Sequence, residues 1–145
     1  MSSKNHKAVW TPAWPGMREL PPDYKVRDVS VIRMPFVRAR GFWPFKWIEV
    51  GERFFTLDAR EQQAVLLHEL GHCRGMHMEI RLLLMPFCGT RWARSIAHKH
   101  ELAADAFVRR NDYGHDMVRY LRRFLNAPDG EFHPSVLLRI DALER

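Results

Sequence analysis

Residues 68–78 read HELGHCRGMHM, and the spacing of their polar side chains predicts a helix together with the chemistry it carries. Residues four apart lie on the same face of an α-helix, so His68 and His72 can present two imidazole nitrogens to one ion. Glu69 lies beside the first histidine, where its carboxylate can reach a water molecule without binding the ion. The stretch therefore predicts a two-histidine metal site with Glu69 as general base.

The residues around this stretch predict where its helix begins and ends. Asp58 can cap the free N–H groups of a first helical turn, and Glu61, three residues later, completes a capping-box spacing. Apolar residues recur at helical spacing as far as Leu70, and Gly75 is placed to end the helix. We expect Cys73, next to the second histidine, to be a small buried residue on the back of this helix.

A catalytic zinc site typically has three protein ligands, so a third must be found. In the metzincin pattern HExxHxxGxxH, the last histidine follows the glycine by three residues. Gly75 is in register, but that position holds Met78, and His77 lies one residue early. His77 would need a bulge to reach the ion, and we expect it to be a partly exposed loop histidine.

The segment HKHELAADAF, residues 98–107, supplies a different third ligand. Glu101 and Asp105 are four apart and share a helix face, so Glu101 can bind zinc while Asp105 accepts a hydrogen bond from a ligating histidine. Ala103 and Ala104 would keep this helix slim where it approaches the HELGH helix. The histidines of the same segment, His98 and His100, are rival ligands.

The rest of the chain predicts an α+β fold with a short sheet before the helices. Prolines and tryptophans in residues 1–24 indicate an extended arm that packs on the domain. Alternation predicts a strand in residues 26–34, and residues 46–57 resemble two short strands joined at Gly51–Glu52. Further helices are expected at about residues 90–110, at 115–125, and from Pro134 to the end.

Composition favours one domain, residues 1–145, because 46% hydrophobic content can form a core without disulfides. Two cysteines and the lack of a signal-like opening favour a cytoplasmic location. The longest apolar run, LLLMPFC at residues 82–88, is far shorter than the roughly 20 residues of a transmembrane helix, and we expect it to pack in the core. The 23 Lys and Arg against 17 Asp and Glu are scattered, which indicates a solvated basic surface and no clear nucleic-acid partner.

Three motifs together resemble one family. HELGH, ELAAD and HPSVLLRIDAL occur in the order of the motifs of peptidase family M forty-eight, the gluzincins that include HtpX-like proteases and the CAAX prenyl protease. The resemblance covers residues from about 50 to 143, and the short interval between the ligand motifs is similar to that of the minigluzincins. It implies a zincin-like metalloprotease fold, a Zn²⁺ cofactor, and a protein or peptide substrate bound in extended form at the edge of the sheet.

The resemblance also implies roles for single residues. The implied metal ligands are His68, His72 and Glu101. Glu69 is implied as the catalytic base, and Asp105 as the partner that orients a ligating histidine. In the C-terminal motif, His133 is implied to assist the oxyanion and Arg139 to brace the active site.

Two other functions are compatible with parts of the sequence. A regulatory metalloprotease of the ImmA/IrrE type, acting on a repressor, shares HELGH and a downstream ExxA segment, but the aspartate of ELAAD and the HPSVLLRI tail argue against it. A non-catalytic binding protein with a structural zinc is the second. Such a site would not need Glu69 and usually closes with a fourth protein ligand.

Overall fold

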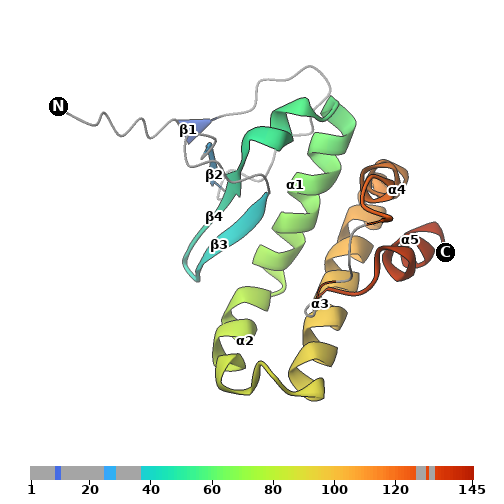
Figure 1. Cartoon of the computed structure of the whole chain (residues 1–145). Helices are drawn as coiled ribbons and strands as arrows, with labels where there is room; N and C mark the ends of the chain where they lie inside the picture. The colour runs from blue at the N-terminus through green and yellow to red at the C-terminus, as the bar shows by residue number, and fades with distance from the viewer. Residues whose placement is uncertain (1–8, 11–24, 29–36, 127–129, 131–132) are drawn as a thin grey trace.

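Figure 1 shows the computed structural model of the chain, which describes residues 9–10, 25–28, 37–126, 130 and 133–145. The strands are β1 (Val9–Trp10), β2 (Lys25–Asp28), β3 (Arg38–Phe42) and β4 (Phe45–Val50), and the 3-10 helices are η2 (Glu52–Thr56) and η3 (Met85–Phe87). The α-helices are α1 (Ala59–Arg74), α2 (His77–Leu83), α3 (Arg91–Arg110), α4 (Gly114–Arg122) and α5 (Val136–Glu144). The sheet lies on one side of α1, and α3, α4 and α5 lie on the other (Figure 1). The predicted mixed α+β class is confirmed.

The strands form one sheet in the order β1-β2-β4-β3, so β3 lies at an edge. β3 and β4 are an antiparallel hairpin in which Ala39 pairs with Ile48, whereas β2 runs parallel to β4. The hairpin turns at Trp43–Pro44, which is a cis peptide bond. Ile48 is fully buried and belongs to the core beneath the sheet, so the hairpin is fixed against the helices and β3 is left as the outer strand.

One strand prediction is wrong, and two predictions extend beyond the described residues. Gly51 does not join two strands, because residues 52–56 form the 3-10 helix η2 with Phe54 buried in the core. Short runs rich in aromatic residues do not distinguish a strand from a helical turn. Of the strand expected at residues 26–34, only residues 26–28 are described, within β2. Most of the arm at residues 1–24 lies outside the described residues.

The first long helix begins and ends as predicted. The Asp58 carboxylate accepts hydrogen bonds from the N–H groups of Arg60 and Glu61 at 3.0 and 2.9 Å, and Gly75 follows the last turn of α1. Cys73 is buried, also as predicted. The Glu61 carboxylate, by contrast, does not serve the capping box. It is fully buried and accepts a hydrogen bond of 2.7 Å from Arg123.

Helix α3 begins at the Thr90 cap, whose hydroxyl accepts from the Ala93 N–H at 3.2 Å, and it packs along α1. The two helices approach closely because small residues meet. A Cβ built on Gly71 would lie 3.0 Å from the Cα of Ala104, which is fully buried. The prediction of a slim helix is confirmed for Ala104, whereas Ala103 is exposed.

The C-terminal helices correspond to the predictions with small shifts of their ends. Helix α4 spans residues 114–122 rather than 115–125, and Pro134 precedes the Ser135 cap of α5. The core prediction for residues 82–88 is wrong, because Leu82, Leu83, Met85 and Phe87 are each more than half exposed. Among the described residues, no helix has both the length and the apolar character needed to cross a membrane.

Candidate metal centre

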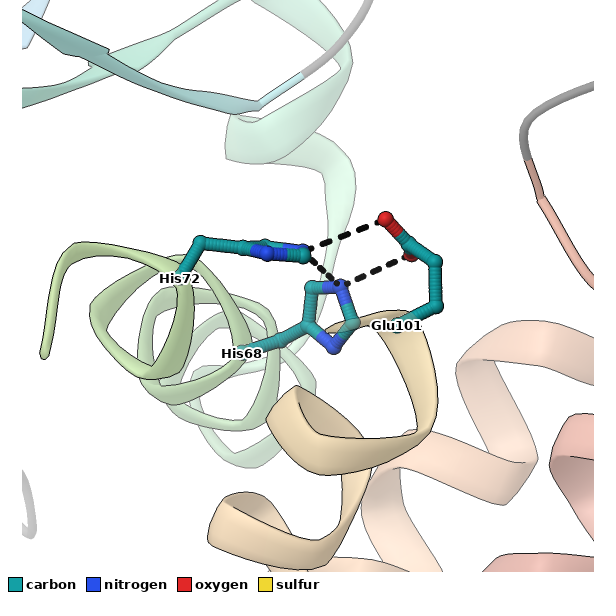
Figure 2. A group of neighbouring side chains, drawn as sticks. All are labelled: His68, His72 and Glu101. Carbon is teal, nitrogen blue, oxygen red and sulfur yellow. Dashed lines mark hydrogen bonds and ion pairs between the residues drawn. The ribbon is translucent and has the colours of Figure 1, made fainter. Parts of the chain in front are cut away.

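Three buried side chains from two helices point toward one another (Figure 2). His68 and His72 come from successive turns of α1, and Glu101 comes from the middle of α3. The Nε2 atoms of the two histidines are 3.1 Å apart. The two Glu101 carboxylate oxygens lie 3.4 Å from His68 Nε2 and 3.3 Å from His72 Nε2. These three residues could hold one metal ion, and the rival histidines of α3 are not part of this group.

The charge of this cluster is set by its carboxylates. Burial opposes ionisation of Glu101, but hydrogen bonds with His133, His68 and His72 hold its pKa well below the usual value. Burial alone would lower the pKa of His68, yet hydrogen bonds to Asp105 and Glu101 raise it to about 9. Burial lowers the pKa of His72 to about 4. Zinc binds histidine nitrogen and carboxylate oxygen, so the residue types of this cluster suit that ion.

Asp105 and Arg139 form the support behind His68. Asp105 Oδ1 lies 2.9 Å from His68 Nδ1, the ring nitrogen that faces away from His72 and Glu101. Arg139 from α5 donates two hydrogen bonds of 2.8 Å to the two oxygens of Asp105. Asp105 is 1% exposed, so its charge is balanced inside the protein by Arg139 rather than by water. The structure thus brings Asp105, which the sequence predicted to orient a ligating histidine, into contact with the outer ring nitrogen of His68.

The prediction for His77 is wrong. His77 is buried at the first position of α2, and its Nδ1 lies 2.9 Å from Nδ1 of His72. Burial, together with the charges of His100 and His72, lowers the pKa of His77 to about 3. The metzincin spacing concerns only the reach of His77 to the ion, and it carries no signal for a contact with the outer ring nitrogen of His72.

Glu69 lies on the same helix and contacts the edge of the sheet. Its Oε2 accepts a hydrogen bond of 2.6 Å from the backbone N–H of Ala39 in β3. Burial raises the pKa of Glu69 above its usual value. The carboxyl group of Glu69 therefore holds a proton more readily than that of an exposed glutamate.

The remaining polar groups converge on Glu101. His133 is half exposed, with Nδ1 3.3 Å from Glu101 Oε2, and Arg139 Nη1 lies 3.8 Å from the same oxygen. Arg81 of α2 donates a hydrogen bond of 2.6 Å to Oε1. Sequence reasoning did not identify Arg81, because it lies in no motif and approaches the site only through the turn between α1 and α2.

The cluster opens into a cavity of about 650 Å³. Its polar wall includes the three candidate ligands and Glu69, and its apolar wall includes Met117, Leu121 and Phe124 from the region of α4. Ala39 of β3 forms part of the rim. A site of this size, with one apolar wall and a few convergent polar groups, is typical of ligand-binding cavities.

No family model matches the sequence, and no curated protein matches it. The fold is similar to that in the crystal structure of S. mikatae Ste24p, with a TM-score of 0.55 and 18% sequence identity. The match covers 88% of this chain and 45% of the other, so the chain spans about half the length of the structure it matches. At this identity the similarity concerns the fold alone.

Proposed function

We propose that this chain is a zinc-dependent endopeptidase of zincin-like fold, in which His68, His72 and Glu101 hold the ion and Glu69 is the general base. The observation that carries the proposal is the position of Glu69. Its carboxylate borders the same cavity as the three donors. The family that the motifs resemble consists of zinc proteases, which adds support from the sequence.

The spacing of the donor atoms supports zinc as the cofactor. Zinc binds histidine nitrogen and carboxylate oxygen at about 2.0–2.2 Å in tetrahedral sites, which places ligand atoms about 3.3 Å apart. The two histidine nitrogens lie 3.1 Å apart, and each lies 3.3 or 3.4 Å from a different oxygen of the Glu101 carboxylate. The cluster has three donors and borders a cavity, whereas a structural zinc site usually closes with four protein ligands.

Zinc held there would acidify a water molecule and stabilise negative charge on the carbonyl oxygen of the scissile peptide bond. Glu69 takes the proton of the attacking water and gives it to the departing amine. Burial favours this role because it raises the pKa of Glu69 toward the range in which one group can both accept and donate a proton. His133 borders the cavity, where a hydrogen bond to the oxyanion is its proposed role.

The substrate is proposed to be an extended peptide lying along β3. This strand is at the sheet edge, so one side of its backbone faces away from β4, and its Ala39 lines the cavity. Edge strands bind extended peptides through such outward backbone groups. Arg139, by holding Asp105, is proposed to keep His68 oriented. The single domain at residues 1–145 and the cytoplasmic location stay predictions.

Cleavage of a peptide library by the wild type and by Glu69→Gln tests the proposal. The amide keeps the size of the side chain and removes the base, so Glu69→Gln should retain zinc and its melting temperature while cleavage falls by about 100-fold or more. Equal cleavage by the two proteins contradicts the mechanism. A zinc-loaded wild type that cleaves nothing would favour a non-catalytic zinc protein. A wild type that cleaves repressors alone would favour the ImmA/IrrE alternative.

A further inference from the structure

The two ring nitrogens of His72 face two different partners. Nε2 faces His68 and Glu101, at 3.1 and 3.3 Å. Nδ1 faces Nδ1 of His77, at 2.9 Å. His77 therefore contacts the outer side of His72, opposite the candidate metal position, and both histidines are buried.

Metal binding would fix the direction of this hydrogen bond. A histidine that gives the lone pair of Nε2 to an ion carries its proton on Nδ1, and that N–H usually donates to a nearby acceptor. Nδ1 of His77 is within hydrogen-bond distance. A neutral imidazole has one donor and one acceptor nitrogen, so His77 accepts at Nδ1 and carries its own proton on Nε2.

The local backbone is built to hold the His77 ring in this position. A Cβ on Gly75 would lie 2.2 Å from Nε2 of His77, so only glycine leaves space for the ring. Met76, in the turn between α1 and α2, has φ of 53°, a left-handed conformation. On its other side the His77 ring stacks on His100 of α3, with centroids 4.1 Å apart and planes 4° from parallel.

We propose that His77 is a positioning residue of the metal centre that accepts a hydrogen bond from His72 and fixes the tautomer and orientation of that ligand. The inference rests on the metal site of the proposed function. His77 holds the second histidine ligand as Asp105 holds the first, at the same contact distance of 2.9 Å. The pattern HxxGxH at residues 72–77 encodes the arrangement, since its glycine makes room for its last histidine.

The test measures the zinc dissociation constant by competition with a chelator. His77→Phe keeps a ring against His100 but removes the acceptor, and zinc binding should weaken by about 10- to 100-fold. His77→Asn places an amide oxygen near the position of Nδ1 and should restore most of the affinity. Gly75→Ala should weaken binding as His77→Phe does, because it displaces the ring. His115→Phe is the matched control, since His115 is exposed on α4.

The outcomes separate this inference from the function it rests on. Failure of the wild type to bind zinc would contradict the proposed function itself. Wild-type affinity in folded His77→Phe, or equal weakening by Phe and Asn, would overturn the role of His77. If the variants fail to fold, NMR of the histidine ring nitrogens in the zinc-loaded wild type tests the role of His77 instead. A proton on Nδ1 of His72 and on Nε2 of His77 is expected, and a proton on Nδ1 of His77 would overturn the proposal.

Discussion

Arg139 holds Asp105 through two hydrogen bonds of 2.8 Å, one to each carboxylate oxygen, in a pair that joins α5 to α3. Both side chains are largely buried, at 12% and 1% exposure. The pair therefore links the C-terminal helix to the candidate metal centre, because Asp105 also contacts Nδ1 of His68.

Removing this arginine should weaken both folding and metal binding. Arg139→Met leaves a buried carboxylate without its partner, which costs about 3–5 kcal/mol in the free energy of unfolding. Zinc affinity should fall by about 10-fold or more, since Asp105 then orients His68 less well. Urea denaturation and chelator competition measure the two effects. Arg145→Met, which breaks an exposed pair with Asp141, should change stability by about 1 kcal/mol or less. Equal effects of the two substitutions would contradict this role for Arg139.

The close contact between α1 and α3 predicts a second effect. Gly71→Ala adds a methyl group 3.0 Å from the Cα of Ala104 and should separate the two helices that carry the ligands. We expect a loss of about 1–3 kcal/mol in the free energy of unfolding, together with weaker zinc binding. Gly89→Ala is the matched control, because a Cβ there meets nothing within 4 Å. If Gly71→Ala were as stable as Gly89→Ala, the helix contact would not limit the site.

Substitution of the buried carboxylate at the start of α1 should lower stability without changing metal binding. Glu61 is fully buried and receives hydrogen bonds from Arg119 and Arg123, which tie α1 to the end of α4. Glu61→Gln should cost about 1–3 kcal/mol, measured by urea denaturation. Zinc affinity should stay within about twofold of wild type. A large loss of zinc affinity in the folded variant would mean that the site depends on this network.

The interactions of the Glu79 carboxylate should make the stability of the fold depend on pH. It accepts from the Trp43 N–H at 2.8 Å and pairs with Lys46 at 2.7 Å, which ties α2 to the β3–β4 hairpin. Burial by itself would raise the pKa of Glu79. The hydrogen bonds from Lys46 and Trp43 lower the pKa by more than burial raises it, so the net shift is downward from 4.5. A lowered pKa in the folded state stabilises the protein above the pKa of the unfolded chain, and this contribution is lost as the pH falls through the folded value.

The corresponding measurement is the free energy of unfolding from pH 7 down to pH 3 for wild type and Glu79→Gln. The variant should be less stable at pH 7, and the difference should shrink as the pH falls below about 4.5. Glu52→Gln, at an exposed position, is the control and should follow the wild type. A constant difference between Glu79→Gln and wild type at all pH values would show that the charge of Glu79 contributes nothing.

The part of the site that depends on helical spacing could be predicted from the sequence. His68 and His72 share a face because they are four residues apart, and Glu101 and Asp105 do so for the same reason. The cap at Asp58 and the end at Gly75 follow from local backbone chemistry. Such features need no knowledge of the rest of the fold.

The contacts made through turns could not be predicted in this way. The burial of His77 depends on the left-handed Met76, and the contact of Arg81 with Glu101 depends on where α2 packs. The exposure of Leu83 and Phe87 contradicts a prediction based on hydrophobicity alone, because α2 and η3 turn these side chains outward. In each case the direction of a short element, rather than its composition, decides what its side chains touch.

Metal analysis of the purified protein decides whether His68, His72 and Glu101 bind zinc. We expect one zinc ion per chain in the wild type, loss of the ion in Glu101→Ala, and full retention in Glu52→Ala, which changes an exposed glutamate. Circular dichroism should show that both variants are folded. Wild type without stoichiometric zinc, or folded Glu101→Ala that binds zinc as tightly as Glu52→Ala, would contradict the assignment of His68, His72 and Glu101 as the metal centre.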